Sequence, residues 1–270
     1  MQFVFKRNEL KYRLREDQRR LLEDLLAAHM EPDAHGASTV RNVYYDTPTH
    51  LLARRSEEHP LYKEKLRLRS YVPARESSLV FLELKKKFDG VVYKRRATLP
   101  LAAAEATLVG ERAPQGQIER EIATAASVYE GLRPAMYLAY EREAFFARGD
   151  HDFRVTLDQG IRCRWDDVSL AGPTDGELLI SPGETLMELK SSQALPLWMV
   201  EFLGSQRIFK ASFSKYGAAW RLQSSRRPLR QQVLSTGGRE GLPLVSGLRA
   251  GEQVRAKLRR GIAPYVIQRG

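Results

Sequence analysis

Short segments in which charged and apolar residues alternate are the feature of this sequence that most restricts its fold. In residues 65–69, three basic residues alternate with two leucines. Successive side chains of a β-strand point to opposite faces, so this pattern predicts a strand with one charged and one apolar face. The pattern recurs in residues 7–13, 79–85, 154–158, 161–165 and 187–190.

Helical patterns are fewer than strand patterns. Residues 16–30 place four leucines and Met30 on one helical face. Residues 117–131 and 196–204 are also expected to be helical, and residues 214–223 are expected to form a helix capped by Ser214. Many strands with few helices predict an α+β fold dominated by antiparallel strands.

The charged strand faces allow two architectures. In an ordinary open sheet, the charged face meets water and the apolar face covers a core. In a closed β-barrel, the apolar faces pack outward against helices and the charged faces line a lumen. Like charges opposite each other on neighbouring strands are destabilising, so a face this basic favours a lumen that holds an anion. The periodicity by itself leaves both architectures open.

The net charge of +11 is concentrated at the C-terminal end of the chain. Residues 226–270 contain ten basic and two acidic residues, which gives +8, and they are rich in Gly, Pro and Ser. We expect residues 1–223 to form one domain and residues 224–270 to form a basic, mostly irregular extension. Within it, residues 252–260 have the pattern of a short basic helix. A polyanion partner and a merely solvated tail are both compatible with this composition.

Several function classes are excluded by what the sequence lacks. No apolar run approaches the 18 residues of a membrane span, and the first residues lack the apolar core of a signal peptide. The single cysteine, Cys163, excludes an internal disulfide framework and favours a cytoplasmic location. The sequence contains no P-loop, no H-E-x-x-H spacing and no signature of sequence-specific nucleic-acid binding.

The order of the charged segments resembles one known family. The chain reads FKRNELKYRL, VRNVYYDT, YKEKLRLRSY and VFLELKKKFDGVVYKRR, and continues with YLAYEREAFF, FRVTLDQGIRCR, LMELKSS and FKASFSKYGAAW. Over about residues 3–222, these segments resemble the VTC domain, the polyphosphate polymerase core of the vacuolar transporter chaperone complex. That family belongs to the triphosphate tunnel metalloenzymes, which are related to the CYTH group.

The resemblance implies a closed antiparallel barrel with peripheral helices, whose basic tunnel binds ATP and polyphosphate with Mn²⁺ or Mg²⁺. The implied reaction is transfer of the ATP γ-phosphate to a growing polyphosphate chain. Two alternatives use the same basic tunnel: hydrolysis of a triphosphate or nucleoside triphosphate, and binding of polyphosphate without catalysis.

The resemblance also implies a set of site residues. The expected catalytic cations are Lys11, Arg67, Arg69, Lys85, Arg142 and Arg154. The expected phosphate-binding residues are Lys190, Lys210 and Lys215, and the expected metal ligands are Glu188, Glu83 and Glu9. Arginine binds phosphate oxygens bidentately, whereas lysine offers a mobile point charge that lets a chain slide past. A lysine just after a helix cap also lies beside backbone N–H groups that attract anions.

Some assignments keep a structural alternative. For Glu9 and Glu83, an ion pair with neighbouring lysines is the alternative to metal binding. The wider superfamily often opens with E-x-E-x-K, whereas this chain has only Glu9 before Lys11. Asp158 is expected to orient Arg154, and Tyr45 and Asp46 are expected to serve packing and strand termination.

Overall fold

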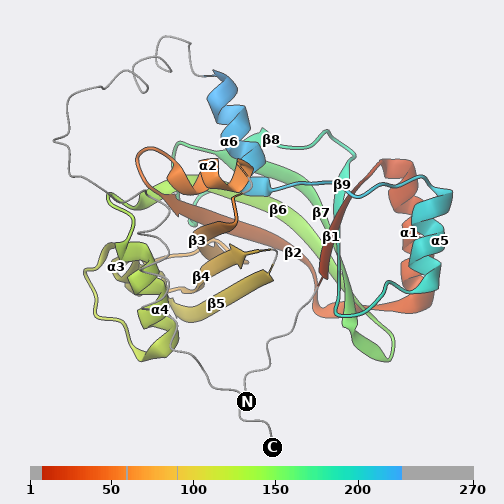
Figure 1. Ribbon diagram of the computed structural model, residues 1–270, viewed down its shortest axis with the longest axis horizontal. Helices are drawn as coiled ribbons and strands as arrows, with labels where there is room; N and C mark the ends of the chain where they lie inside the picture. Colours follow the sequence, from red (N-terminus) through yellow and green to blue (C-terminus); the bar gives the residue numbers. More distant parts are fainter. Residues whose placement is uncertain (1–7, 59, 90, 227–270) are drawn as a thin grey trace, which may run out of the picture. The chain divides into compact units, whose positions relative to one another are not determined.

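A large antiparallel sheet dominates the computed structural model, which describes residues 8–58, 60–89 and 91–226 (Figure 1). The strands are β1 (Asn8–Leu14), β2 (Met30–Asp46), β3 (Tyr62–Ser70), β4 (Leu79–Phe88), β5 (Val91–Pro100), β6 (Arg133–Ala147), β7 (Asp150–Arg164), β8 (Glu177–Leu178) and β9 (Thr185–Ser191). The strand order is β1-β9-β7-β6-β2-β3-β4-β5, and β8 pairs with β7. The predicted α+β class with a mainly antiparallel sheet is therefore confirmed.

The four helices predicted within residues 1–223 are present, and two further helices, at residues 51–57 and 101–109, were not predicted. The helices are α1 (Glu16–His29), α2 (Leu51–Glu57), α3 (Leu101–Val109), α4 (Gly116–Ser127), α5 (Leu197–Ser205) and α6 (Lys215–Arg226). The Ser214 hydroxyl accepts a hydrogen bond from the Gly217 N–H at 3.1 Å, so Ser214 caps α6 as predicted. The predicted basic extension lies almost entirely outside the described residues, and its short helix over 252–260 lies wholly outside them.

The sheet is not a closed barrel, and this part of the prediction is wrong. In the described part of the chain, the strand order ends at β1 and β5 without a backbone pairing between them. The chain that leads into α6 takes one edge of β1, where Tyr12 pairs with Lys210 and the Ala211 N–H bonds the Lys11 carbonyl at 2.7 Å. An ion pair nevertheless links β1 to the other half of the sheet, since Lys85 Nζ of β4, the neighbour of β5, lies 3.5 Å from the Glu9 carboxylate of β1.

The apolar faces of the strands pack against helices in two clusters. One cluster joins β1, β7 and β9 to α1 and α5, with Leu14, Leu22 and Met187 fully buried. Figure 1 shows α1 and α5 together on that side of the sheet. The other cluster joins the remaining long strands to the other four helices, with Leu66 and Leu82 fully buried. None of the helices in the described ranges has the length and apolar character needed to cross a membrane.

Asp46 fixes two helices to the end of β2. Its carboxylate is fully buried and accepts hydrogen bonds from the backbone N–H groups of Leu52 and Ala53 at 2.9 Å each. The Tyr216 hydroxyl of α6 donates to the same carboxylate at 2.5 Å. The carboxylate therefore satisfies helix-terminal N–H groups of α2 and anchors α6 at the same time. Its expected role in strand termination is accompanied by this second role in joining two helices.

Replacing Asp46 is expected to destabilise the fold strongly. Asp46→Ala leaves buried donors without an acceptor, so the free energy of unfolding should fall by about 3 kcal/mol. Tyr216→Phe removes one hydrogen bond and should cost about 1 kcal/mol. Urea denaturation measures both, with Asp24→Ala on the exposed side of α1 as a control expected within about 0.5 kcal/mol of the parent. Equal stability of Asp46→Ala and the control would contradict this role.

Candidate phosphate-binding site

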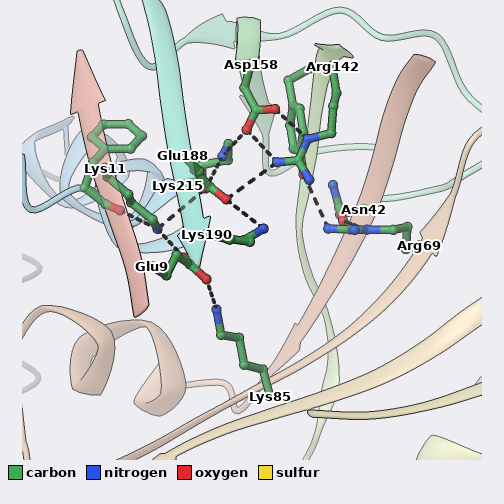
Figure 2. Close-up of polar contacts among 12 residues, drawn as sticks. Glu9, Lys11, Asn42, Arg69, Lys85, Arg142, Asp158, Glu188, Lys190 and Lys215 are labelled. Atoms are coloured by element: carbon green, nitrogen blue, oxygen red, sulfur yellow. Dashed lines mark hydrogen bonds and ion pairs between the residues drawn. The ribbon is translucent and has the colours of Figure 1, made fainter. Parts of the chain in front are cut away.

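The strand register brings charged side chains from distant parts of the sequence onto one face of the sheet (Figure 2). This inner face lies opposite the apolar outer face that packs against the helices. Lys11 of β1 stands opposite Glu188 of β9, and Glu188 stands opposite Thr156 of β7. Arg142 of β6 stands opposite Asp158 of β7. Opposite residues of antiparallel strands project to the same face, so these side chains share one surface.

Glu188 is the acidic centre of this surface and is 6% exposed. Four cationic groups surround its carboxylate: Lys215 Nζ at 3.2 Å, Lys190 Nζ at 3.4 Å, Lys11 Nζ at 3.7 Å and the Arg142 guanidinium at 3.9 Å. Burial by itself would raise the pKa of Glu188, but the neighbouring ammonium groups hold it well below its usual range. The carboxylate is therefore ionised and compensates part of the positive charge around it.

Asp158 holds two of the same cations in fixed positions. The fully buried carboxylate accepts two bonds from Arg142, at 2.6 and 2.7 Å, and lies 2.5 Å from Lys215 Nζ. This bidentate geometry restricts the guanidinium more than a single contact does. The expectation that Asp158 orients Arg154 is wrong. Residues four apart on a strand lie about 13 Å from each other, and Asp158 binds Arg142 on the neighbouring strand.

Tyr140 connects this centre to the arginine pair of β3. Arg69 donates to the Tyr140 hydroxyl at 3.3 Å and to the Asn42 side-chain oxygen at 3.0 Å. Lys215 Nζ lies 4.7 Å from the centre of the Tyr140 ring, and the Arg142 guanidinium lies 5.1 Å from it. Burial would raise the pKa of Tyr140, but Arg142 and Arg69 lower it overall. Arg69 and Arg142, both predicted site residues, are thus brought together around one phenol.

Glu83 forms a second acidic centre on β4 and is 1% exposed. Its carboxylate lies 2.7 Å from Arg67, 2.8 Å from Lys94, 2.5 Å from Arg96 and 3.9 Å from Arg69. Burial would raise the pKa of Glu83, but Arg67 and Arg69 lead the cations that lower it. Arg67 and Arg96 donate hydrogen bonds to the two oxygens of Glu83 at 2.7 and 2.6 Å, whereas the nearest cation to Glu188 lies at 3.2 Å. This closer pairing favours the ion-pair alternative for Glu83 over metal binding.

A row of lysines crosses three strands beside these centres. The register places Lys65 of β3 opposite Lys85 of β4, and Lys85 opposite Lys94 of β5. The next row places Lys63 opposite Lys87. Burial lowers the pKa of Lys65 and of Lys85, and the nearby lysines lower both further. Such like-charge pairs are destabilising in an empty sheet, so this region has a surplus of positive charge suited to an anion.

Lys65, Lys94 and Arg96 belong to this charged surface but were not among the predicted site residues. Lys65 lies on the predicted charged face of 65–69, and its Nζ donates to the Ser214 hydroxyl at 2.9 Å. Lys94 and Arg96 are two residues apart in β5, but the residue between them is also basic, so charged and apolar residues do not alternate there. The signal was therefore present for Lys65 but not for the two residues of β5.

Two predicted residues lie apart from these centres. Arg154 is on the inner face of β7, but its guanidinium lies 3.3 Å from Asp33 and 4.2 Å from the Phe146 ring centre. Lys210 is exposed and pairs with Tyr12, whose side chain belongs to the apolar cluster on the outer face. The structure therefore does not place Lys210 with the other predicted lysines.

Glu188 and Glu9 are the carboxylates best placed for a divalent cation. They lie on adjacent strands and interact electrostatically, and Glu9 also lies 3.3 Å from Lys11 Nζ and 3.5 Å from Lys85 Nζ. Burial would raise the pKa of Glu9, but Lys85 leads the cations that lower it to about 2. No cage of three His, Cys, Asp or Glu side chains occurs in residues 8–58, 60–89 and 91–226. Mg²⁺ commonly uses one or two carboxylates with phosphate oxygens, and this pair fits that arrangement once the lysines turn towards a phosphate.

Replacing Glu83 is expected to destabilise the protein in a pH-dependent way. Glu83→Gln leaves buried cations uncompensated and should lower the free energy of unfolding by about 3 kcal/mol at pH 7. The folded-state pKa lies below the usual 4.5, so the stabilisation is complete above pH 4.5 and declines below it by about 1.4 kcal/mol per pH unit.

Urea denaturation of the parent and of Glu83→Gln between pH 7 and 3.5 measures this difference. Glu201→Gln, on the exposed side of α5, is the matched control and should follow the parent at every pH. A difference that widens on acidification would contradict the assigned ion pairs.

Comparison with known proteins identifies the family. The family model of the VTC domain matches residues 6–223. A comparison with curated proteins gives no match. Similar solved structures include two putative adenylate cyclases. The protein from Bacillus halodurans has a TM-score of 0.49 and 16% identity over 76% of this chain and 92% of that chain. The protein from Vibrio parahaemolyticus has a TM-score of 0.41 and 14% identity over 81% of this chain and 99% of that chain.

A further similar structure is the Schizosaccharomyces pombe Mediator head module, with a TM-score of 0.40 and 11% identity over 74% of this chain and 90% of that chain. The family match differs in kind from these structural similarities because it rests on the sequence. It extends over β1 to β9 and most of α6, and so contains both acidic centres and the lysine row. The chain belongs to the VTC domain family.

Proposed function

We propose that this protein is a polyphosphate polymerase that transfers the γ-phosphate of ATP to the end of a polyphosphate chain. Membership of the VTC domain family supports a reaction of this class. The observation that carries the proposal is the row of Lys65, Lys85 and Lys94 in direct register across three strands. Glu83 and Glu9 compensate part of this positive charge, and a polyanion would neutralise the remainder.

The extent of the charged surface fits a linear anion better than a single phosphate group. Neighbouring strands lie about 4.8 Å apart, so the lysine row spans about 10 Å across the sheet. The row of Arg67, Glu83 and Arg96 lies two residues further along the same strands, about 7 Å away. Cations therefore cover an area that several linked phosphates would fill.

The arginines and the lysines have different roles in the proposed reaction. Arg67 and Arg142 are held by buried carboxylates, so their donors are fixed before a substrate binds. Fixed donors stabilise charge that develops during phosphoryl transfer without a cost of reorganisation. Lys11 and Lys190 lie near Glu188 on flexible side chains, and they are proposed to turn towards phosphate oxygens when ATP or polyphosphate enters.

The chemistry needs little else from the protein. The terminal phosphate of the growing chain attacks the γ-phosphorus, and ADP leaves from the opposite side. A divalent cation at Glu188 and Glu9 would neutralise further phosphate charge and order the triphosphate. Lys215, beside Asp158 at the start of α6, adds a fixed positive charge next to a helix N-terminus.

The product distribution tests the proposal. The purified protein is incubated with ATP and Mn²⁺ or Mg²⁺, samples are quenched with EDTA, and ³¹P NMR spectra are recorded over time. The expected result is growth of mid-chain phosphate signals together with release of ADP. Orthophosphate as the only new product would assign hydrolysis instead, and binding of polyphosphate without turnover would assign a non-catalytic module.

Lys85 and Lys86 provide a matched test of the inner face. They are neighbours on β4 with side chains exposed to similar extents, but Lys85 faces the lysine row and Lys86 pairs with Glu64 at 3.3 Å. Lys85→Ala should lower kcat/KM for ATP by roughly 100-fold, because it removes a cation from the phosphate path. Lys86→Ala should leave kcat/KM within about twofold. Equal losses in the two variants would show that the inner face has no special role.

The lowered pKa of Lys94 leads to a predicted pH dependence of phosphate binding. Burial lowers its pKa from 10.5 to about 8, although Glu83 acts in the opposite direction. Lys94 therefore loses its charge as the pH rises through 8, and its attraction for phosphate is lost with it. Lys94→Arg keeps the charge, because the arginine pKa lies above 12.

Isothermal titration with metal-free tripolyphosphate at pH 7 and pH 9 checks this prediction. Between these pH values, the Kd of the parent should rise about fivefold more than the Kd of Lys94→Arg. The comparison of two proteins cancels the titration of tripolyphosphate itself. Identical pH profiles would remove Lys94 from the binding surface.

A further inference from the structure

Thr156 carries a buried hydroxyl that the site as described above does not use. It lies in the middle of β7 and is 3% exposed. Its Oγ1 atom has no hydrogen-bond partner in the part of the chain that the structure describes. A buried hydroxyl without a partner costs about 1–3 kcal/mol, and valine would supply the same shape without that cost. The presence of the hydroxyl therefore calls for a partner in another state of the site.

The register shows which group that partner is. On one side, Thr156 stands opposite Ala144 of β6, which has no polar side chain. On the other side, it stands opposite Glu188 of β9, whose carboxylate lies on the same inner face. Cβ atoms of such cross-strand pairs lie about 4.5–5.5 Å apart, within reach of a hydrogen bond between a hydroxyl and a glutamate. Asp158, two residues along the strand, is already held by Arg142 and Lys215.

Lysine ammonium groups surround the carboxylate that this hydrogen bond would reach. Lys215 Nζ lies 3.2 Å from Glu188, Lys190 Nζ 3.4 Å and Lys11 Nζ 3.7 Å. In the proposed function, the mobile lysines turn towards phosphate oxygens, and the carboxylate loses part of its support. A carboxylate that binds a cation through one oxygen needs a donor on the other oxygen to keep its orientation.

We propose that Thr156 is a positioning residue whose hydroxyl donates to the Glu188 carboxylate when a phosphate chain is bound, and so orients Glu188 towards the divalent cation. This inference rests on the proposed function, because it needs a phosphate ligand and a cation at Glu188. It assigns Thr156 no contact with the reacting atoms. It explains why a hydroxyl is buried without a partner beside a carboxylate that four cationic groups surround.

The test compares metal-free tripolyphosphate with its preformed Mn²⁺ complex by isothermal titration. The ratio of the two Kd values measures how much the metal strengthens binding. Thr156→Val should reduce this ratio about tenfold, which is the usual effect of losing a partner of a metal ligand, and should leave the metal-free Kd unchanged. Thr156→Ser keeps the hydroxyl and should restore the ratio. Thr98→Val, at an exposed threonine of β5, is the matched control and should behave as the parent.

The Glu188→Gln background shows whether the hydroxyl acts through Glu188. The expected result is that Thr156→Val causes no further loss there, because two residues that act as a pair are not additive. Weaker binding of both ligands by Thr156→Val would assign a direct phosphate contact and overturn the proposal. An unchanged ratio in Thr156→Val would also overturn it, while leaving the proposed function intact. A parent protein that binds neither ligand would refute both.

Thermal unfolding without ligand shows whether the Thr156→Val variant is folded. Thr156→Val should melt at the same temperature as the parent or slightly above it, because the variant removes an unsatisfied buried group. A lower melting temperature would show that the hydroxyl has a structural role without ligand, which contradicts the proposal.

Discussion

Electrostatic repulsion among the cations of the inner sheet face is the constraint on which the structure depends. Lysine stands opposite lysine across β3, β4 and β5, and arginines line the same surface. Two buried carboxylates, Glu83 and Glu188, each lie within 4.0 Å of four cationic groups and make this arrangement possible. The compensation is incomplete along the lysine row, and that remaining charge is the physical basis of the proposed polyanion binding.

The apolar outer face anchors the strands that carry this charged surface. Helices pack on both parts of the sheet, and Asp46 ties α2 and α6 to the end of β2. This tie also places the start of α6, and with it Lys215, against Asp158 and Glu188. Folding of the outer layer and assembly of the charged centre are therefore coupled through a single helix. Charged groups held in this way have fixed orientations, and the proposed phosphoryl transfer requires donors oriented in advance.

Much of this organisation was predictable from period-two alternation. It identified the strand faces, the α+β class and the charged surface that contains Arg67, Arg69 and Lys85. It did not identify the pairing of strand edges, because side-chain alternation carries no information on which edge remains open. The contact of residues 210 and 211 with β1, which leaves Lys210 outside the charged centre, was therefore not foreseen.

The sequence pattern also could not predict which side chains of the site pair with each other. Asp158 binds Arg142 across the strands and not Arg154 on its own strand, and this choice depends on register. The same holds for Thr156, whose position opposite Glu188 appears only when β7 and β9 are aligned. Motifs on single strands name the residue types of a site, whereas register decides which of them meet.

Dependence of affinity on phosphate chain length tests most directly whether the inner face is built for a linear polyanion. Isothermal titration at constant ionic strength compares orthophosphate, pyrophosphate, tripolyphosphate and longer chains with the full-length protein. We predict that affinity rises steeply with each added phosphate until the chain covers the lysine row and the Glu188 centre, and then levels off. Equal affinity for orthophosphate and tripolyphosphate would contradict this account, because it would mean that the cations act as separate surface charges.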